Sequence, residues 1–147
     1  MKYNLSLLKN RRVGFDIYKE RKNPFTPLNN KRIRFSSVVK NVKQGKEYIT
    51  FTFENDTKLD VNMLIFYNLL IRYDKEKDIV WLIEDKNKEY MTSFVGFTMF
   101  DTYGFPIEMT QEIMEEKGYK IDMEGFEVLR KLQKDMSSGT FKNNNAF

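Results

Sequence analysis

The chain has 147 residues and a net charge of +4, 41% of its residues are hydrophobic, and it contains neither cysteine nor histidine. This length suits one domain with a buried core. The two missing residue types exclude disulfides, His- or Cys-ligated zinc and catalysis by Ser-His-Asp or Cys-His groups. Because no apolar run is long enough to cross a membrane and the N-terminal apolar stretch is too short for a cleaved signal, we expect a cytoplasmic protein. We also expect neither a metal nor a cofactor.

The positive charge is concentrated in the first third of the chain. Residues 1–50 hold 13 Lys and Arg against 3 acidic residues, whereas the remainder holds 12 basic and 18 acidic residues. This asymmetry favours contact between the basic part and a nucleic acid. A solvated Lys-rich surface, as AT-rich codon usage produces, explains it equally well.

Three runs in the basic part alternate as β-strands do. Val13, Phe15 and Ile17 share one face of a short strand predicted within residues 11–20. Two prolines and an Asn pair predict a loop at residues 23–30. Strands predicted at residues 31–39 and 47–53 flank Gly45 and together indicate a hairpin.

The middle of the chain predicts one buried helix among strands. The run from Met63 to Tyr73 is apolar nearly all round, which favours a core helix capped by Asn62 or Asp60, with a strand as the weaker alternative. Residues 78–84 have the branched and aromatic content of a buried strand. A last strand is expected from Tyr90 to Val95.

The most specific motif of the chain is a turn between predicted helices. Residues 101–106 read Asp-Thr-Tyr-Gly-Phe-Pro, the helix that follows ends in Glu-Lys-Gly at Gly118, and the next opens with Asp-Met-Glu-Gly-Phe-Glu from Asp122. Over residues 98–136 this sequence resembles a segment of alanyl-tRNA synthetase. In that family the segment lies in the part that holds tRNA, so the resemblance implies an RNA-handling helical hairpin.

The resemblance does not imply the synthetase's chemistry. The class II catalytic core is far larger than this chain, and its Arg-bearing motifs have no counterpart here. The editing domains related to this family use His and Cys around a metal, and this sequence has neither. We therefore expect no enzymatic activity.

These observations predict an α+β fold in three parts. Residues 1–96 form a basic, β-rich unit with one core helix, residues 97–136 form the synthetase-like helical hairpin, and residues 137–147 form a flexible tail. A short copy of this segment in a Lys- and Asn-rich chain resembles small accessory proteins of bacteriophages.

Two groups of residues are candidate nucleic-acid ligands. The predicted hairpin offers cations for phosphates and one ring for base stacking: Arg32, Arg34, Lys40, Lys43, Lys46 and Tyr48. Protection of an edge strand against aggregation explains these cations equally well. In the synthetase-like motif, the family's acidic reader of the acceptor stem maps to Asp101, with Tyr103 beside it. Simple helix capping and packing also explain this motif.

The expected function is thus that of a non-enzymatic accessory protein that binds tRNA or another RNA. The alternative is a phage-type interaction module that binds and modulates a host protein. This alternative arises because residues 101–136 hold nine acidic against five basic residues, which makes the segment a poor phosphate binder by itself. Acidic pairs such as Glu115 and Glu116 lack the supporting residues of a magnesium site and indicate a solvated face.

Overall fold

The computed structural model describes residues 1–18 and 31–138, and within them the predicted α+β fold is confirmed. The predicted loop at residues 23–30, and residues 139–147 of the predicted tail, lie outside the described residues, whereas residues 137 and 138, also expected in the tail, end the last helix. The elements run in the order η1 (Leu5–Leu8), β1 (Arg12–Tyr18), β2 (Arg32–Gln44), β3 (Tyr48–Phe53), β4 (Lys58–Asn62), α1 (Met63–Phe66), β5 (Leu69–Asp74), β6 (Ile79–Glu84), β7 (Tyr90–Met91), α2 (Ser93–Tyr103), α3 (Ile107–Glu116), β8 (Lys120–Ile121) and α4 (Met123–Ser138).

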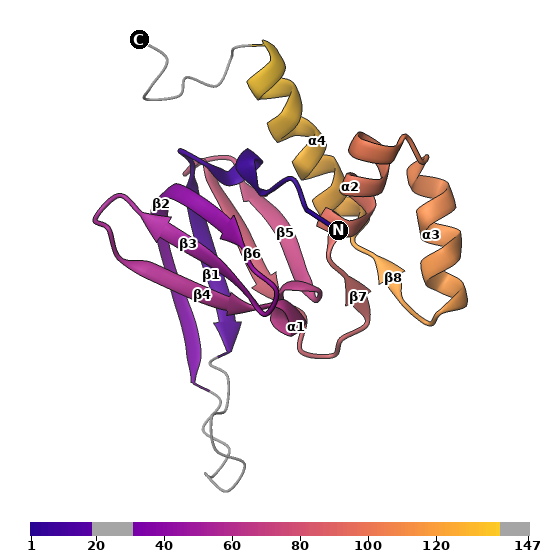
Figure 1. Ribbon diagram of the computed structural model, residues 1–147, viewed down its shortest axis with the longest axis horizontal. Helices are drawn as coiled ribbons and strands as arrows, with labels where there is room; N and C mark the ends of the chain where they lie inside the picture. Colours follow the sequence, from indigo (N-terminus) through magenta and orange to yellow (C-terminus); the bar gives the residue numbers. More distant parts are fainter. Residues whose placement is uncertain (19–30, 139–147) are drawn as a thin grey trace, which may run out of the picture.

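Six of the strands in the described residues form one mixed sheet, ordered β4-β3-β2-β1-β6-β5. Strand β2 pairs with β1 through its first half and with β3 through its second half, with a register shift between Val39 and Asn41. Because β2 changes partner in this way, β3 and β4 fold over one face of β1 (Figure 1). Phe15 of β1 therefore meets Phe51 and Phe53 of β3, with ring centroids 4.8 and 5.7 Å apart.

The hairpin predicted around Gly45 is confirmed. Gly45 donates its backbone N–H to the carbonyl of Tyr48 at 2.8 Å and closes the turn between β2 and β3. Along β3, Ile49, Phe51 and Phe53 are buried, whereas Tyr48 is exposed. The apolar and polar residues alternate in the sequence because only one face of this strand is buried.

Two predicted elements are wrong in part. The helix expected from Met63 to Tyr73 ends at Phe66, capped by Asn62, whose side chain accepts the N–H of Leu64 at 2.8 Å. The chain then turns and continues as strand β5. The strand expected from Tyr90 to Val95 ends at Met91, and helix α2 begins at Ser93.

Helices α2, α3 and α4 lie together at one side of the sheet (Figure 1). Both helices of the predicted hairpin, α3 and α4, are present, and each packs against α2, which lies between them and was not predicted. Phe97 of α2 and Phe126 of α4 are buried, with ring centroids 6.1 Å apart. Both rings belong to the same hydrophobic core as the sheet, so the synthetase-like segment is held in place by the β-rich part.

Candidate nucleic-acid interface

The structure divides the basic residues of the predicted hairpin between the two halves of β2. Arg32 and Arg34 lie where β2 pairs with β1, opposite Tyr18 and Asp16. Lys43 lies where β2 pairs with β3, opposite Thr50, and Lys46 follows at the turn. The two groups are therefore separated by most of the length of a 13-residue strand.

Arg32 and Arg34 are bound to a carboxylate that the sequence reasoning missed. Arg32 donates to both oxygens of Asp16 at 2.6 and 2.5 Å, and Arg34 donates to Oδ2 at 2.5 Å. The Arg34 guanidinium also lies 4.2 Å from the ring centroid of Trp81. The hydrogen bond from Arg32 holds the pKa of Asp16 below its ordinary value of 3.8, against the opposing effect of burial. The only sequence signal for this cluster is Asp16 itself, a carboxylate between inward-facing apolar residues.

Lys40 is likewise engaged by a carboxylate. Its ammonium group donates to Asp56 at 2.8 Å, and this hydrogen bond raises the pKa of Lys40 and lowers that of Asp56. Both side chains are exposed to solvent, so the pair contributes little to stability. It also neutralises the cation that sits at the register shift of β2.

The N-terminal segment, residues 1–4, joins the end of the β2–β3 hairpin to the synthetase-like motif. Gln44 accepts the backbone N–H of Tyr3 at 2.9 Å and donates to the carbonyl of Met1 at 2.8 Å. The next residue, Asn4, donates its side-chain amide to Asp101 at 3.5 Å. Burial and the neighbouring Tyr67 raise the pKa of the Tyr3 phenol. The segment is thus fixed at both ends.

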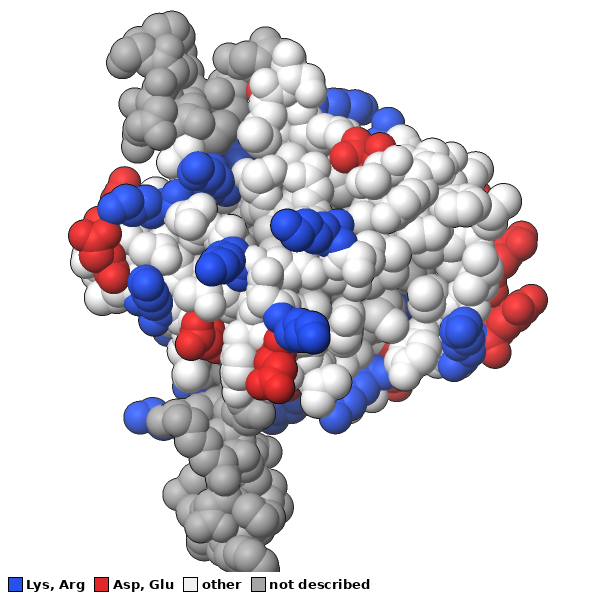
Figure 2. All heavy atoms as spheres, viewed as in Figure 1, with Lys and Arg blue, Asp and Glu red and all other residues white. Residues whose placement is uncertain are grey.

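Two shallow depressions flank this N-terminal segment and share Lys2 and Gln44. Their volumes are about 320 and 360 Å³. The first is lined by Lys2, Tyr3, Asn4, Leu5, Ser6, Val42, Lys43 and Gln44, and the second by Met1, Lys2, Gln44, Gly45, Lys46, Met63 and Tyr67. Three cations, Lys2, Lys43 and Lys46, therefore border these two neighbouring depressions, which are together called the groove. Lys and Arg side chains are spread over the face of the molecule that carries β2, β3 and β4 (Figure 2).

Asp101 and Tyr103 lie in the last turn of α2. Gly104 ends this helix in a left-handed conformation (φ 73°), which glycine adopts without steric cost. Asp101 accepts hydrogen bonds from Asn4 and from Gln133 of α4, yet stays exposed, as does Tyr103. Of the predicted residues, Asp101 is thus brought toward Lys43 and Lys46 by the N-terminal segment, whereas Arg32 and Arg34 are not.

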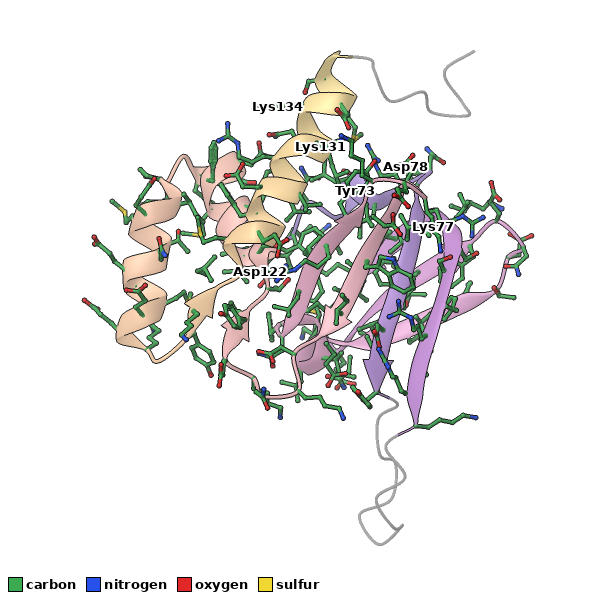
Figure 3. The ribbon with its side chains drawn as sticks, turned by 180° about the vertical axis from the view of Figure 1, so that it is seen from behind. Tyr73, Lys77, Asp78, Asp122, Lys131 and Lys134 are labelled. Carbon is green, nitrogen blue, oxygen red and sulfur yellow. The ribbon has the colours of Figure 1, made fainter. Side chains whose placement is uncertain are left out.

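The second half of the synthetase-like motif is buried and fixes α4. Asp122 is 2% exposed and caps α4 by accepting the N–H of Gly125 at 3.2 Å, as predicted. Figure 3 shows Asp122 at the start of α4, beside β5, and shows Lys131 further along the helix near Tyr73. The Lys131 ammonium lies 4.8 Å from the centroid of the Tyr73 ring. These contacts hold the helix rather than offer groups to a ligand.

The sequence reasoning missed Lys2, Asn4 and Gln44, which build the groove. Within residues 1–18 and 31–138, no three acidic side chains are placed to hold a metal ion. None of the helices described there has the length and apolar character needed to cross a membrane.

In comparison with known proteins, a family model matches the second half of the chain, and one relative matches a longer stretch that reaches into the first half. The family model of class II (A) tRNA synthetases matches residues 77–147. The chloroplastic/mitochondrial alanine–tRNA ligase of Arabidopsis thaliana is 31% identical over 108 residues, which are 72% of this chain and 10% of that protein.

Two bacterial relatives match shorter segments at higher identity. The alanine–tRNA ligase of Microcystis aeruginosa is 47% identical over 55 residues, 37% of this chain and 6% of that protein. The enzyme of Lactococcus lactis subsp. cremoris is 56% identical over 39 residues, 26% of this chain and 4% of that protein. The chain spans a tenth or less of the length of these curated relatives. The predicted resemblance is confirmed: residues 77–147 match the family model of class II tRNA synthetases, and the chain is similar over part of its length to alanine–tRNA ligases.

Proposed function

We propose that this chain is a non-enzymatic accessory protein that binds tRNA across its N-terminal segment. The likeness to alanine–tRNA ligases, proteins named for their action on tRNA, supports the choice of ligand. Because that likeness spans a tenth or less of the ligases, RNA binding is the part of their function that we assign to this chain, and aminoacylation is not.

The observation that carries the proposal is the placement of Asn4. Its side chain reaches Asp101 of the synthetase-like motif, while its neighbour Tyr3 is held by Gln44 at the end of the basic hairpin. A ligand lying along residues 1–4 therefore meets Lys2, Lys43 and Lys46 at the two depressions, and Asp101 where Asn4 contacts it.

Each group in this arrangement has a distinct role toward RNA. The lysines supply salt-dependent attraction to phosphates, and the exposed ring of Tyr48 offers a stacking surface for an unpaired base. Asp101 accepts a hydrogen bond from a base amino group in exchange for the long 3.5 Å bond from Asn4. The carboxylate of Asp101 repels phosphate, so it favours an approach in which base edges face α2.

Charge reversal on the hairpin tests the proposal. In filter binding with unfractionated tRNA, K43E/K46E should weaken binding by about tenfold near 0.1 M salt and reduce the salt dependence. The matched control is K75E/K77E, which makes the same change in net charge on the exposed turn between β5 and β6. Equal affinity of the two double variants for tRNA would refute the proposed surface. Equal affinity of the native chain for tRNA and for double-stranded DNA of the same length would refute tRNA as the ligand.

A further inference from the structure

Large apolar side chains are exposed along and beside α3. Tyr103, Phe105, Met109 and Ile113 are each between 40 and 56% exposed. Single exposed apolar residues are ordinary on protein surfaces, but a contiguous group is typical of an interaction site. Met109 and Ile113 are four residues apart on α3 and so lie on one face of the helix.

The opposite face of α3 already serves the fold. Thr110 is 4% exposed. Ile107 packs so closely on α2 that its Cδ1 would lie 2.8 Å from a Cβ placed on Gly96. The helix is therefore held on α2 by its inner face, and the apolar ridge, defined by Met109 and Ile113, is not needed for that packing.

The charge beside the apolar ridge selects the kind of partner. Helix α3 contains four glutamates and no Lys or Arg between Ile107 and Glu116. Glu108, Glu112 and Glu116 recur every four residues and form a stripe next to the ridge. Acidic side chains line the margin of the molecule where α3 lies (Figures 1 and 2). This charge repels nucleic acid, and it opposes pairing of two copies of α3, which would bring two glutamate stripes together.

We infer that the outer face of α3 is a docking surface for a basic amphipathic helix of a partner protein. Two apolar side chains of that helix, four residues apart, pack on Met109 and Ile113, and its Lys or Arg residues pair with the glutamate stripe. The flexible Met109 side chain adapts to apolar groups of different shapes. This inference gives the expected protein-interaction role a location that is separate from RNA binding.

A designed peptide provides the test. The probe is a fluorescently labelled amphipathic helix of about 18 residues with Leu on one face and Lys beside it, and its partner probe has Glu at every Lys position. Fluorescence anisotropy should show binding of the Lys peptide and at least tenfold weaker binding of the Glu peptide. M109S/I113S should weaken binding of the Lys peptide at least tenfold, and E112K/E116K should do the same by charge. Leu64→Ser, at a 74% exposed site on α1, is the matched control and should leave binding unchanged.

Several outcomes would overturn the inference. These are no binding of the Lys peptide, equal binding of the two peptides, or unchanged binding in M109S/I113S. A native dimer in light scattering that M109S/I113S dissociates would show that a second copy covers the ridge instead. Circular dichroism melting of each variant separates lost docking from lost folding. M109S/I113S, which leaves the net charge unchanged, should not alter tRNA affinity, so failure here is distinct from failure of the proposed function.

Discussion

The carboxylate of Asp122 accepts the backbone N–H of Ile71 at 2.9 Å, so the residue that caps α4 also binds the edge strand of the sheet. Arg72 adds a charged hydrogen bond to the same carboxylate at 2.7 Å. An edge strand with unpaired N–H groups invites pairing with other chains. Asp122 removes one such group and at the same time fixes the start of α4 against β5.

Asp122→Ala should lower the free energy of unfolding by about 3 kcal/mol. The change leaves the N–H of Ile71 buried without a partner, uncaps α4 and removes one of the partners of the Arg72 guanidinium. Urea denaturation checks the magnitude, and hydrogen exchange should show faster exchange of the Ile71 amide. Glu124→Gln, which removes an exposed partner of Arg72, is the control and should cost less than about 0.5 kcal/mol. A loss in Asp122→Ala no larger than this control would contradict the role given to Asp122.

Gly125→Ala should also destabilise the protein, although alanine is the better helix former. A Cβ at this position would lie 2.3 Å from Asp122 Oδ2 and 2.6 Å from Ser93 Oγ. The clash displaces the capping carboxylate, and we expect a loss of about 1–3 kcal/mol in thermal or urea unfolding. Glu127→Ala, two residues along on the exposed face of α4, should be neutral or slightly stabilising. A stability gain in Gly125→Ala would show that the Asp122 side chain moves freely.

The prediction of the β-hairpin was right and that of the core helix was wrong because the two strands differ in how many of their faces are buried. Residues of β3 alternate because one face is buried, and that alternation is visible in the sequence. Strand β5 has Leu69 and Ile71 fully buried and Leu70 half-buried. A strand covered on both faces has no period of two, and its sequence cannot be told from a buried helix.

The parts of the candidate site that the sequence did not reveal depend on long-range pairing. The capping role of Asp122 follows from its local motif, but its bond to Ile71 joins residues 51 apart. Asn4 and Asp101 are 97 residues apart, and Tyr3 and Gln44 are 41 apart. No local spacing encodes such pairs. The grouping of cations at the end of the hairpin therefore became visible only with the tertiary structure.

Asp16 should make stability depend on pH on the acid side. Its pKa is lowered in the folded state, so its contribution is complete above the unfolded value of 3.8 and is lost as the pH falls toward the folded value. At pH 7, Asp16→Asn should lower the free energy of unfolding by about 1–2 kcal/mol. The loss stays modest because Arg32 and Arg34 are half-exposed and can be rehydrated when the carboxylate is removed. The difference in free energy of unfolding between the native chain and the variant should become smaller below about pH 4.

The single tryptophan gives the readout for this experiment, because Trp81 lies against Arg34. Urea unfolding, monitored by Trp81 fluorescence at pH 7, 5 and 3, measures this difference in free energy directly. Asp60→Asn, which removes an exposed carboxylate bonded to Thr50, serves as the control. A difference in free energy of unfolding between the native chain and Asp16→Asn that stays constant down to pH 3 would contradict the lowered pKa of Asp16 in the folded state.

Gln44→Ala should release the N-terminal segment without changing any charge. Gln44 provides both hydrogen bonds that hold Met1 and Tyr3, whereas the Tyr3 ring keeps its contact with Phe66 at 5.1 Å. We therefore expect a modest stability loss of about 1 kcal/mol, together with faster exchange of the Tyr3 amide. If tRNA binds along this segment, the affinity of the variant for tRNA should fall roughly threefold, because part of the binding energy is then used to order the segment. Thr52→Ala, at an outward position of β3, is the control for the hairpin. Unchanged tRNA affinity despite a released Tyr3 amide would place the RNA elsewhere on the molecule.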